Sequence, residues 1–464
     1  MVPRLLYSPS LIRFAALGFG IFVLFSTFRL YAGRISFEYY TYGDLSDKLV
    51  RIRLPRDVTN DADNSTTYGL TTTKHTIENN TSSVESTSKS TSTSTSTTTT
   101  ESPLPRLGGV LDCPKKLLRP SAKTPSNPDR VRPADIHFVA ALGDSITAGY
   151  LSFNESERHR RVDDESDGSA VGNSFSMGGD GTLRTHLTLP NILRSLNPDL
   201  QGFSSGKGLD ELNARLNLAV PGMLSDDLKR QAIELVQRFK DYDSWDVMHK
   251  WKLINIFIGT TELRKLCDEG IEVSKSTYKR NLEEAINIIL TSVPRTIISL
   301  IGMWSPEFVF HAQSAVRNFT HQCLDRSFTV RARTLVEQYR EVNYELAAGT
   351  HLRRKDSVIL VQRLFNYITK PATNVDQSHG SQQLRIYLLQ SDGSHNRDFY
   401  ANDDFHISKF GQSLLAKQLW RHLVTPYGEK YTSNRELNND DARLECPRKN
   451  CPYIRTPANS IDCK

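Results

Sequence analysis

The chain has 464 residues, of which 38% are hydrophobic and 24% are charged, enough for one large folded domain with additional segments. Its 58 Lys and Arg residues against 52 Asp and Glu residues give a net charge of +6, spread along the chain without a basic block. This distribution is typical of a solvated surface and argues against nucleic-acid binding.

The first element is apolar. Fifteen uncharged residues lie between Arg13 and Arg29, which is short for a membrane span and long for an ordinary core helix. Residues 1–35 are therefore predicted to be an uncleaved signal-anchor or a signal peptide that ends at Ala32. Positive charge before the segment favours a cytosolic N-terminus. In both cases we expect the rest of the chain to enter the secretory pathway, as a single-pass membrane protein with its ectodomain outside or as a secreted protein.

Residues 36–110 form the second segment, which is dominated by Ser and Thr and includes the run TSTSTSTTTT. Such a composition buries too little apolar surface to offset the chain entropy, so it predicts a disordered stalk, O-glycosylated or a plain linker. N-glycosylation sequons lie in this segment and in the region after it. They are Asn64, Asn79, Asn80, Asn154 and Asn318.

Residues 111–464 have the texture of a globular domain. Short apolar or alternating runs, which predict strands, occur at 135–142, 214–220, 252–258, 296–302 and 357–361. Segments with helical spacing lie between them at 225–239, 277–293 and 330–346. Strands that alternate with helices predict an α/β fold with a parallel sheet covered on both faces.

The six cysteines form no CxxC pair and no Cys/His array of zinc type, and three of them fall in the last 19 residues. In an oxidising compartment they predict disulfides whose pairing the sequence leaves open, with buried reduced thiols as the alternative. The cysteines are Cys113, Cys267, Cys323, Cys446, Cys451 and Cys463.

Candidate catalytic residues lie at both ends of this domain. Ser145, in ALGDSITAGY, follows the strand predicted at 135–142, and ligands of parallel sheets bind beyond the carboxyl ends of strands. A serine hydroxyl becomes nucleophilic when a histidine, itself held by a carboxylate, takes its proton. The segment DDFHIS supplies His406 and, three residues earlier, Asp403, whereas Asp404 has the wrong phase.

An acyl-transfer site also needs hydrogen-bond donors for the oxyanion. One candidate is the backbone N–H of Ser145, which we expect at the start of a helix. The other is the N–H of Gly222 in NLAVPGM, because glycine lets the backbone approach a substrate closely.

Five segments together resemble the phospholipase B branch of the GDSL (SGNH) serine hydrolases, in order over residues 113–455. They are LRPSAKTPSNPDRVRPADIHFVAALGDSITAGY, SFSMGGDGTLRTHLTLPNILRSLNPDLQGFS, LNLAVPGM, LINIFIGTTEL and DDFHIS. The resemblance implies a three-layer α/β/α flavodoxin-like fold that hydrolyses esters of phospholipids, lysophospholipids or other lipids without a metal or other cofactor. It also implies that Ser145 is the nucleophile, His406 the general base and then acid, Asp403 its orienting carboxylate, and Gly222 an oxyanion donor.

One position departs from that family. Where the family has Gly-Gly-Asn-Asp, this chain reads Gly259-Thr260-Thr261-Glu262, so Thr261 replaces the Asn whose amide is the third oxyanion donor. Loss of one such donor typically lowers kcat by about 10²–10³-fold. The retained triad favours an active enzyme, either slow or with a rearranged oxyanion site that uses Thr261 or Thr260. The alternatives are a catalytically weak or inactive lipid-binding ectodomain and an esterase for O-acetylated sugars.

The expected attachment to the membrane also differs. Membrane-bound relatives in this branch usually carry a C-terminal span, whereas this chain ends in the polar CPRKNCPYIRTPANSIDCK. We therefore expect a type II arrangement, anchored through the N-terminal segment. The partners we expect are lipid esters and a membrane, with no nucleic acid and no metal.

Overall fold

The computed structural model describes residues 107–153, 168–267, 273–304, 326–364, 398–403, 405–430 and 442–463. The predicted anchor or leader at 1–35, nearly all of the stalk predicted at 36–110, and all five sequons lie outside these residues. None of the described helices is both long and apolar enough to cross a bilayer.

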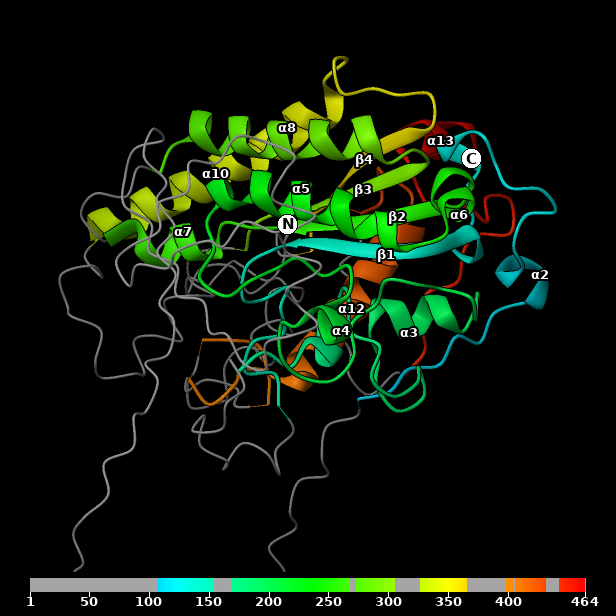
Figure 1. Ribbon diagram of the computed structural model, residues 1–464, viewed down its shortest axis with the longest axis horizontal. Coiled ribbons are helices and arrows are strands. Elements are labelled where there is room, and N and C mark those ends of the chain that lie inside the picture. Colours follow the sequence, from blue (N-terminus) through cyan, green and yellow to red (C-terminus); the bar gives the residue numbers. More distant parts are fainter. Residues whose placement is uncertain are drawn as a thin grey trace, which may run out of the picture. The chain divides into compact units, whose positions relative to one another are not determined.

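The centre of the fold is a sheet of four parallel strands in the order β1-β2-β3-β4 (Figure 1). The strands are β1 (Ile136–Gly143), β2 (Trp251–Phe257), β3 (Thr296–Ile301) and β4 (Ser357–Gln362). Nearly every residue in them is buried, as expected for a parallel sheet with both faces covered. Four of the five predicted strands are therefore confirmed, each within two residues of its expected ends.

The fifth, predicted at 214–220, is not a regular strand. It runs along the free edge of β1, with an isolated parallel bridge between Asn217 and Ala141. The N–H of Leu218 donates to the carbonyl of Ala141 at 2.9 Å, and the N–H of Ala141 donates to the carbonyl of Leu216 at 3.0 Å. Counted as the second segment of the sheet, it gives the order 2-1-3-4-5 of flavodoxin-like folds.

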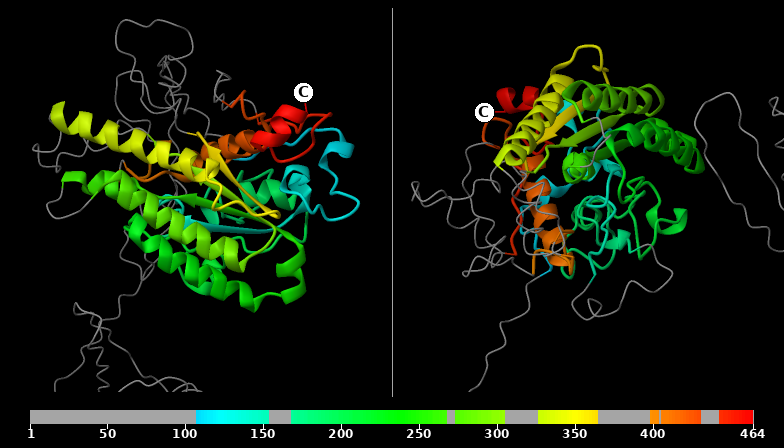
Figure 2. Two further views of the ribbon diagram at one scale, coloured as in Figure 1. Left: turned by 90° about the horizontal axis from the view of Figure 1, so that it is seen from above. Right: turned by 90° about the vertical axis from the view of Figure 1, so that its left-hand side faces the viewer.

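Helices form a layer on each face of the sheet, which confirms the α/β/α architecture (Figures 1 and 2). On one face lie α5 (Leu228–Arg238), α8 (Lys275–Ser292) and α10 (Arg326–Ala348). The other face carries α3 (Leu189–Arg194) and α12 (Lys409–Val424). The three helices predicted from spacing are confirmed as α5, α8 and α10.

Shorter elements complete the described fold. The short α-helices are α2 (Lys115–Leu118), α4 (Glu211–Ala214), α6 (Ser244–His249), α7 (Thr260–Arg264) and α13 (Pro457–Asp462). The 3₁₀ turns are Pro128–Arg130, Pro133–Asp135, Val171–Asn173, Ser225–Asp227, Phe239–Asp241 and Lys265–Cys267.

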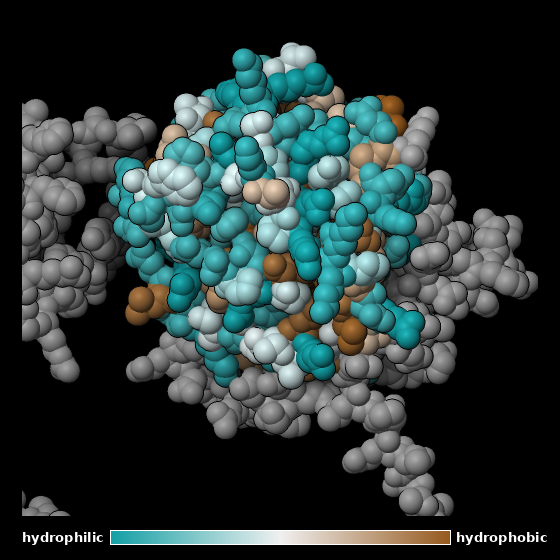
Figure 3. Space-filling view, turned by 90° about the vertical axis from the view of Figure 1, so that its right-hand side faces the viewer, coloured by the Kyte–Doolittle hydropathy of each residue, from teal (hydrophilic) through white to brown (hydrophobic). Residues whose placement is uncertain are grey.

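Strand register determines which loops become neighbours. Gly143, the last residue of β1, pairs with Phe257, the last residue of β2. The loops after these strands therefore leave the sheet at the same edge, which we call the carboxyl edge. The amino ends of the strands lie near α6, and the molecular face on that side is predominantly hydrophilic (Figure 3).

Two disulfides close the C-terminal tail. Cys113 is bonded to Cys446, and Cys451 to Cys463. The Thr456 hydroxyl at the start of α13 donates to the Asp129 carboxylate at 2.5 Å, which joins the tail to the beginning of the domain. The expectation of disulfides is thus confirmed for these four cysteines.

Candidate active site

Ser145 lies at the carboxyl edge, two residues after the end of β1. It is 5% exposed, and the N–H of Tyr150 donates to its carbonyl at 3.0 Å. The expectation that a helix begins at Ser145 is wrong. A single turn forms instead, because Gly149 adopts a positive φ of 69° that redirects the chain before a second helical turn. The Ser145 N–H therefore lies in a tight turn between strand and loop.

Asp403 and His406 form a hydrogen-bonded pair within one loop, as the D-x-x-H spacing predicted. His406 Nδ1 lies 2.5 Å from Asp403 Oδ2, and the backbone N–H groups of His406 and Phe405 donate to Asp403 Oδ1 at 2.9 and 3.2 Å. Burial would raise the pKa of the Asp403 carboxyl, but the hydrogen bonds and charge of His406 outweigh it and lower that pKa. Asp403 is therefore an anion that fixes the orientation of the imidazole.

The loop that carries this pair is closed by backbone hydrogen bonds. The N–H of Ala401 donates to the carbonyl of His406 at 2.7 Å, and the N–H of Ser408 donates to the carbonyl of Phe399 at 3.0 Å. The Ser408 hydroxyl then caps α12 by accepting from the N–H of Gly411 at 3.0 Å. The imidazole is thus held between a closed loop and a capped helix.

One contact joins the serine turn to the histidine loop, and a second joins it to α12. The ring of Tyr150 packs edge-on against the ring of His406, with centroids 4.7 Å apart. Gln412, in the first turn of α12, donates to the carbonyl of Ile146 at 3.2 Å and accepts from the N–H of Phe175 at 2.9 Å. The structure therefore brings the two ends of the domain together at one edge of the sheet.

Ser145 and His406 lie in the same region but are not directly bonded. Among the described residues, no hydrogen bond joins Ser145 Oγ to the His406 imidazole, and each residue is 5% exposed. Hydrogen bonds between nucleophile and base are often long before substrate binds and tighten in the substrate complex.

Gly222 lies in a turn on the free edge of β1. Its φ is 80°, and no heavy atom lies within 4 Å of the position that a Cβ would occupy. The N–H of Val220 donates to the carbonyl of Gly143 at 3.3 Å, which fixes the beginning of this turn against β1. Glycine thus provides both the left-handed backbone and an open surface that a substrate atom can approach.

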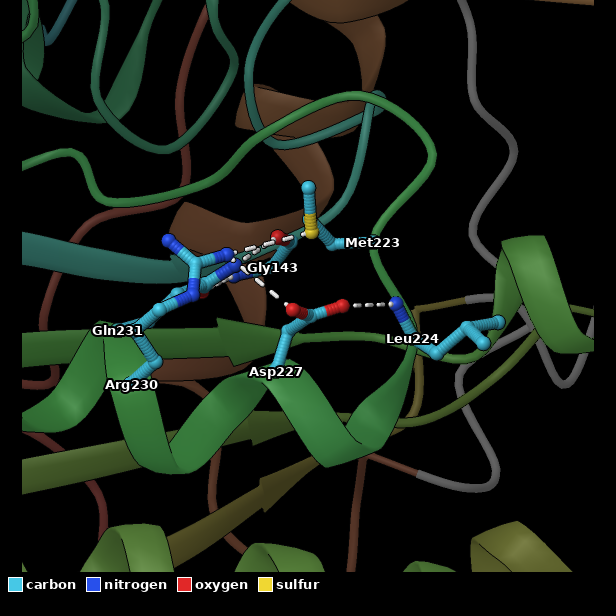
Figure 4. Close-up of polar contacts among 6 residues, drawn as sticks. All are labelled: Gly143, Met223, Leu224, Asp227, Arg230 and Gln231. Atoms are coloured by element: carbon cyan, nitrogen blue, oxygen red, sulfur yellow. Dashed lines mark hydrogen bonds and ion pairs between the residues drawn. The ribbon is translucent and has the colours of Figure 1, made fainter. Parts of the chain in front are cut away.

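Figure 4 shows how the segment after Gly222 is held. Gln231, buried on α5, accepts from the N–H of Gly143 at 2.8 Å and donates to its carbonyl at 2.9 Å. The Asp227 carboxylate accepts from the N–H of Leu224 at 3.1 Å and from the Arg230 guanidinium at 3.1 Å. These contacts join the Gly222 turn, α5 and the end of β1.

Thr261 lies in the first turn of α7, directly after β2, and is 7% exposed. Its turn is connected to the serine turn by Asp144, whose carboxylate accepts from the N–H groups of Thr260 at 3.1 Å and Ile146 at 3.2 Å. Burial raises the pKa of Asp144 to about 6, although these hydrogen bonds oppose the change. The three segments that carry the expected oxyanion donors thus meet at the carboxyl edge.

Four supporting side chains were missed by the sequence analysis: Asp144, Gln231, Glu262 and Gln412. Asp144 had a usable signal, its position directly before the candidate Ser145 at the end of a predicted strand. The other three had none, since their partners lie 37 to 266 residues away in the chain.

No group of three or more His, Cys, Asp or Glu side chains with the geometry to hold a metal ion occurs in the part of the chain that the structure describes. The chemistry expected from the sequence involves Ser145, His406 and Asp403 and assigns no role to a metal.

Comparison with known proteins gives consistent matches. The family model described as GDSL-like Lipase/Acylhydrolase matches residues 139–419. Phospholipase B1, membrane-associated, is similar at 32% identity over 346 residues in Homo sapiens and at 31% over 344 residues in Mus musculus. Each alignment covers 74% of this chain but only 23% and 22% of the relative, respectively.

Solved structures give a weaker likeness. A putative GDSL-like lipase from Parabacteroides merdae aligns at 13% identity with a TM-score of 0.33, covering 62% of this chain and 94% of that one. The chain spans less than a quarter of the length of the human and mouse relatives named above.

Proposed function

Because this chain belongs to the GDSL-like lipase/acylhydrolase family, we propose that it is a serine esterase that hydrolyses acyl esters of phospholipids, lysophospholipids or related lipids. Membership supports a carboxylic ester hydrolase, and the similarity to phospholipase B1 supports a lipid substrate.

The proposed reaction has two steps. Ser145 Oγ attacks the ester carbonyl while His406 Nε2 takes its proton, and the carbonyl oxygen becomes an oxyanion. The oxyanion collapses, the alcohol leaves with the proton from His406, and an acyl-enzyme remains on Ser145. Water then attacks that ester, His406 again takes and returns a proton, and the free fatty acid leaves with Ser145 regenerated.

The backbone N–H groups of Ser145 and Gly222, with the Thr261 hydroxyl, are the proposed oxyanion donors. Thr261 lies in the first turn of α7 and is 7% exposed, and we propose that its hydroxyl donates to a bound ester. A threonine hydroxyl is shorter than an asparagine amide, so we expect a weaker contribution from this third donor.

The observation that carries the proposal is the 2.5 Å contact between His406 Nδ1 and Asp403 Oδ2, beside the turn that holds Ser145. It orients the other imidazole nitrogen as a base and stabilises the imidazolium that forms. Such a pair, on a loop closed by backbone hydrogen bonds, is what a serine nucleophile requires.

The test is a hydrolysis panel on the purified full-length chain. We expect the wild type to release fatty acid from a phospholipid or lysophospholipid and Ser145→Ala to release none. The control Ser195→Ala, at a surface serine, should be as active as the wild type. Acetylated xylo-oligosaccharides serve as the competing substrate. Faster hydrolysis of the acetyl sugar would replace the lipid proposal by the O-acetyl esterase.

A second candidate, a weak or inert lipid-binding ectodomain, is favoured by one observation, the Thr261 side chain in the place of an amide donor. Thr261→Asn is expected to raise kcat by up to about 10²–10³-fold if the cradle is merely incomplete. Thr350→Asn, at an exposed site, is the matched control. Lipid binding without turnover in the wild type and in Thr261→Asn would establish the binding role.

We propose further that the protein acts outside the cell and is held to a membrane by residues 1–35. The disulfides fit an oxidising compartment, and the similar phospholipases are named membrane-associated. In cells, the full-length chain should remain with membranes after alkaline extraction, and its apparent molecular mass should fall when N-glycans are removed. Replacement of residues 1–35 by a cleavable leader should release it into the medium. Full-length protein in the medium would contradict the anchor.

A further inference from the structure

Glu262 is a buried carboxyl group that the proposed reaction does not use. It follows Thr261 in α7 and is 3% exposed. Its Oε1 accepts a hydrogen bond from the N–H of Ser225 at 2.5 Å, while Oε2, among the described residues, has no hydrogen-bond partner. A side chain with this cost of burial needs a structural or functional reason.

The partner of Glu262 belongs to the Gly222 turn. Ser225 lies three residues after Gly222, so the hydrogen bond between Ser225 and Glu262 joins the turn of one proposed oxyanion donor to the helix of another, Thr261. Asp227 also binds this turn, but it lies in the same segment and cannot fix the turn relative to α7. The Asn281 amide on α8 also holds Ser225 in place, because it donates to the Ser225 hydroxyl at 3.2 Å.

In the part of the chain that the structure describes, no cation offsets a charge on Glu262. The titratable groups around it are Asp144 after β1, Tyr278 on α8 and Tyr339 on α10. The two tyrosine rings stack at 3.7 Å, and the Tyr278 hydroxyl donates to the carbonyl of Ile258 at 3.2 Å. An ionised Glu262 would thus face a second carboxyl group and two aromatic rings in a dry environment, where charges act strongly.

We infer that Glu262 is a positioning residue, which fixes the Gly222 turn against the Thr261 helix and slows turnover when it loses its proton. The inference rests on the proposed function, because the oxyanion donors are assigned there. The neutral acid holds Ser225 without adding charge. The carboxylate adds a negative charge next to Thr261 in α7, one of the proposed oxyanion donors, so it opposes the transition state.

The pKa of Glu262 sets the pH range over which turnover and stability should change. Burial, with a contribution from Asp144, raises the pKa of Glu262 to about 7, although the Ser225 N–H opposes the change. Turnover should therefore fall as the pH passes about 7. The folded state should also lose stability between about pH 4.5 and 7, because in that interval the folded chain holds a proton that the unfolded chain has released.

Two substitutions of Glu262 separate its charge from its hydrogen bond. Glu262→Gln keeps an oxygen acceptor for Ser225 but cannot ionise. It should retain at least about half of the wild-type kcat at pH 6 and lose the decline above pH 7. Glu262→Ala removes the hydrogen bond to Ser225 and should lower kcat by about 10–100-fold at every pH, which is less than the loss expected for a missing oxyanion donor. The change in KM should be smaller than the change in kcat. The control is Glu284→Gln, a surface carboxyl paired with Lys229.

Stability gives a readout that needs no activity. The melting temperature of the full-length wild type should fall between pH 5 and 7.5 more steeply than that of Glu262→Gln, and Glu284→Gln should follow the wild type. The inference would be overturned if Glu262→Gln kept the decline in kcat above pH 7, or if its kcat were as low as that of Glu262→Ala. A wild type that hydrolyses no ester would refute the proposed function instead, and the stability profiles would still decide whether Glu262 titrates near neutrality.

Discussion

At the scale of single residues, the proposed catalytic chemistry depends on the carboxylate of Asp403. Its hydrogen bonds to the backbone and ring of His406 hold one tautomer of the imidazole. Asp403→Asn should lower kcat by about 10³–10⁴-fold, because the amide removes the charge and allows the wrong tautomer. Asp199→Asn, at an exposed position, should leave kcat unchanged. Steady-state kinetics give the answer, and a loss of less than tenfold would mean that another group orients His406.

Local sequence spacing explains why this pair was predictable. Asp403 and His406 lie three residues apart, so one loop decides their contact. Ser145 could be placed at a strand end by the apolar run before it, since β1 is a buried parallel strand. Glu262 and Gln412 could not be placed in the same way, because their roles depend on partners brought near by folding, the N–H of Ser225 and the carbonyl of Ile146.

At the scale of elements, α12 is attached to the serine turn by Gln412, whose side chain satisfies the N–H of Phe175 and the carbonyl of Ile146. Gln412→Leu should destabilise the fold by about 1–3 kcal/mol, since it leaves two buried backbone groups without partners. It should also lower kcat, because α12 carries the histidine loop.

Denaturant unfolding and steady-state kinetics measure both effects. The control, Gln237→Leu at an exposed site on α5, should change stability by no more than about 0.5 kcal/mol. If Gln412→Leu matched this control in stability and kcat, the hydrogen bonds of Gln412 would contribute nothing measurable to the fold or to turnover.

The same scale shows where periodicity succeeds and fails. The helix α8 buries one stripe and the strand β2 is buried along its whole length, so helical spacing and an apolar run located them from the sequence. The segment at 214–220 looks equally apolar, yet it lies at an edge and forms one isolated bridge to β1, between Asn217 and Ala141. The helix expected at Ser145 ends after one turn because Gly149 is left-handed, and glycine by itself does not reveal which conformation it adopts.

At the scale of the whole molecule, two disulfides of very different span hold the tail. The Cys113–Cys446 bond joins residues 333 positions apart, whereas Cys451–Cys463 spans 12. Loop-closure entropy alone gives about 5–6 kcal/mol for the first and about 3 kcal/mol for the second. Replacing the first pair by serine should therefore lower the melting temperature more than replacing the second, as calorimetry would show. The reverse order would mean that strain or residual structure governs the tail.

The central claim is that a serine near the front of the folded domain and a histidine near its back form one acyl-transfer site at the carboxyl edge of the sheet. The most direct test is to treat the full-length protein with a fluorophosphonate, and to locate the adduct by mass spectrometry in wild type, Ser145→Ala and His406→Ala. The account predicts one adduct, on the peptide that contains Ser145, absent from Ser145→Ala and formed at least about 10²-fold more slowly in His406→Ala. An adduct on another residue, or equal labelling of all three proteins, would contradict it.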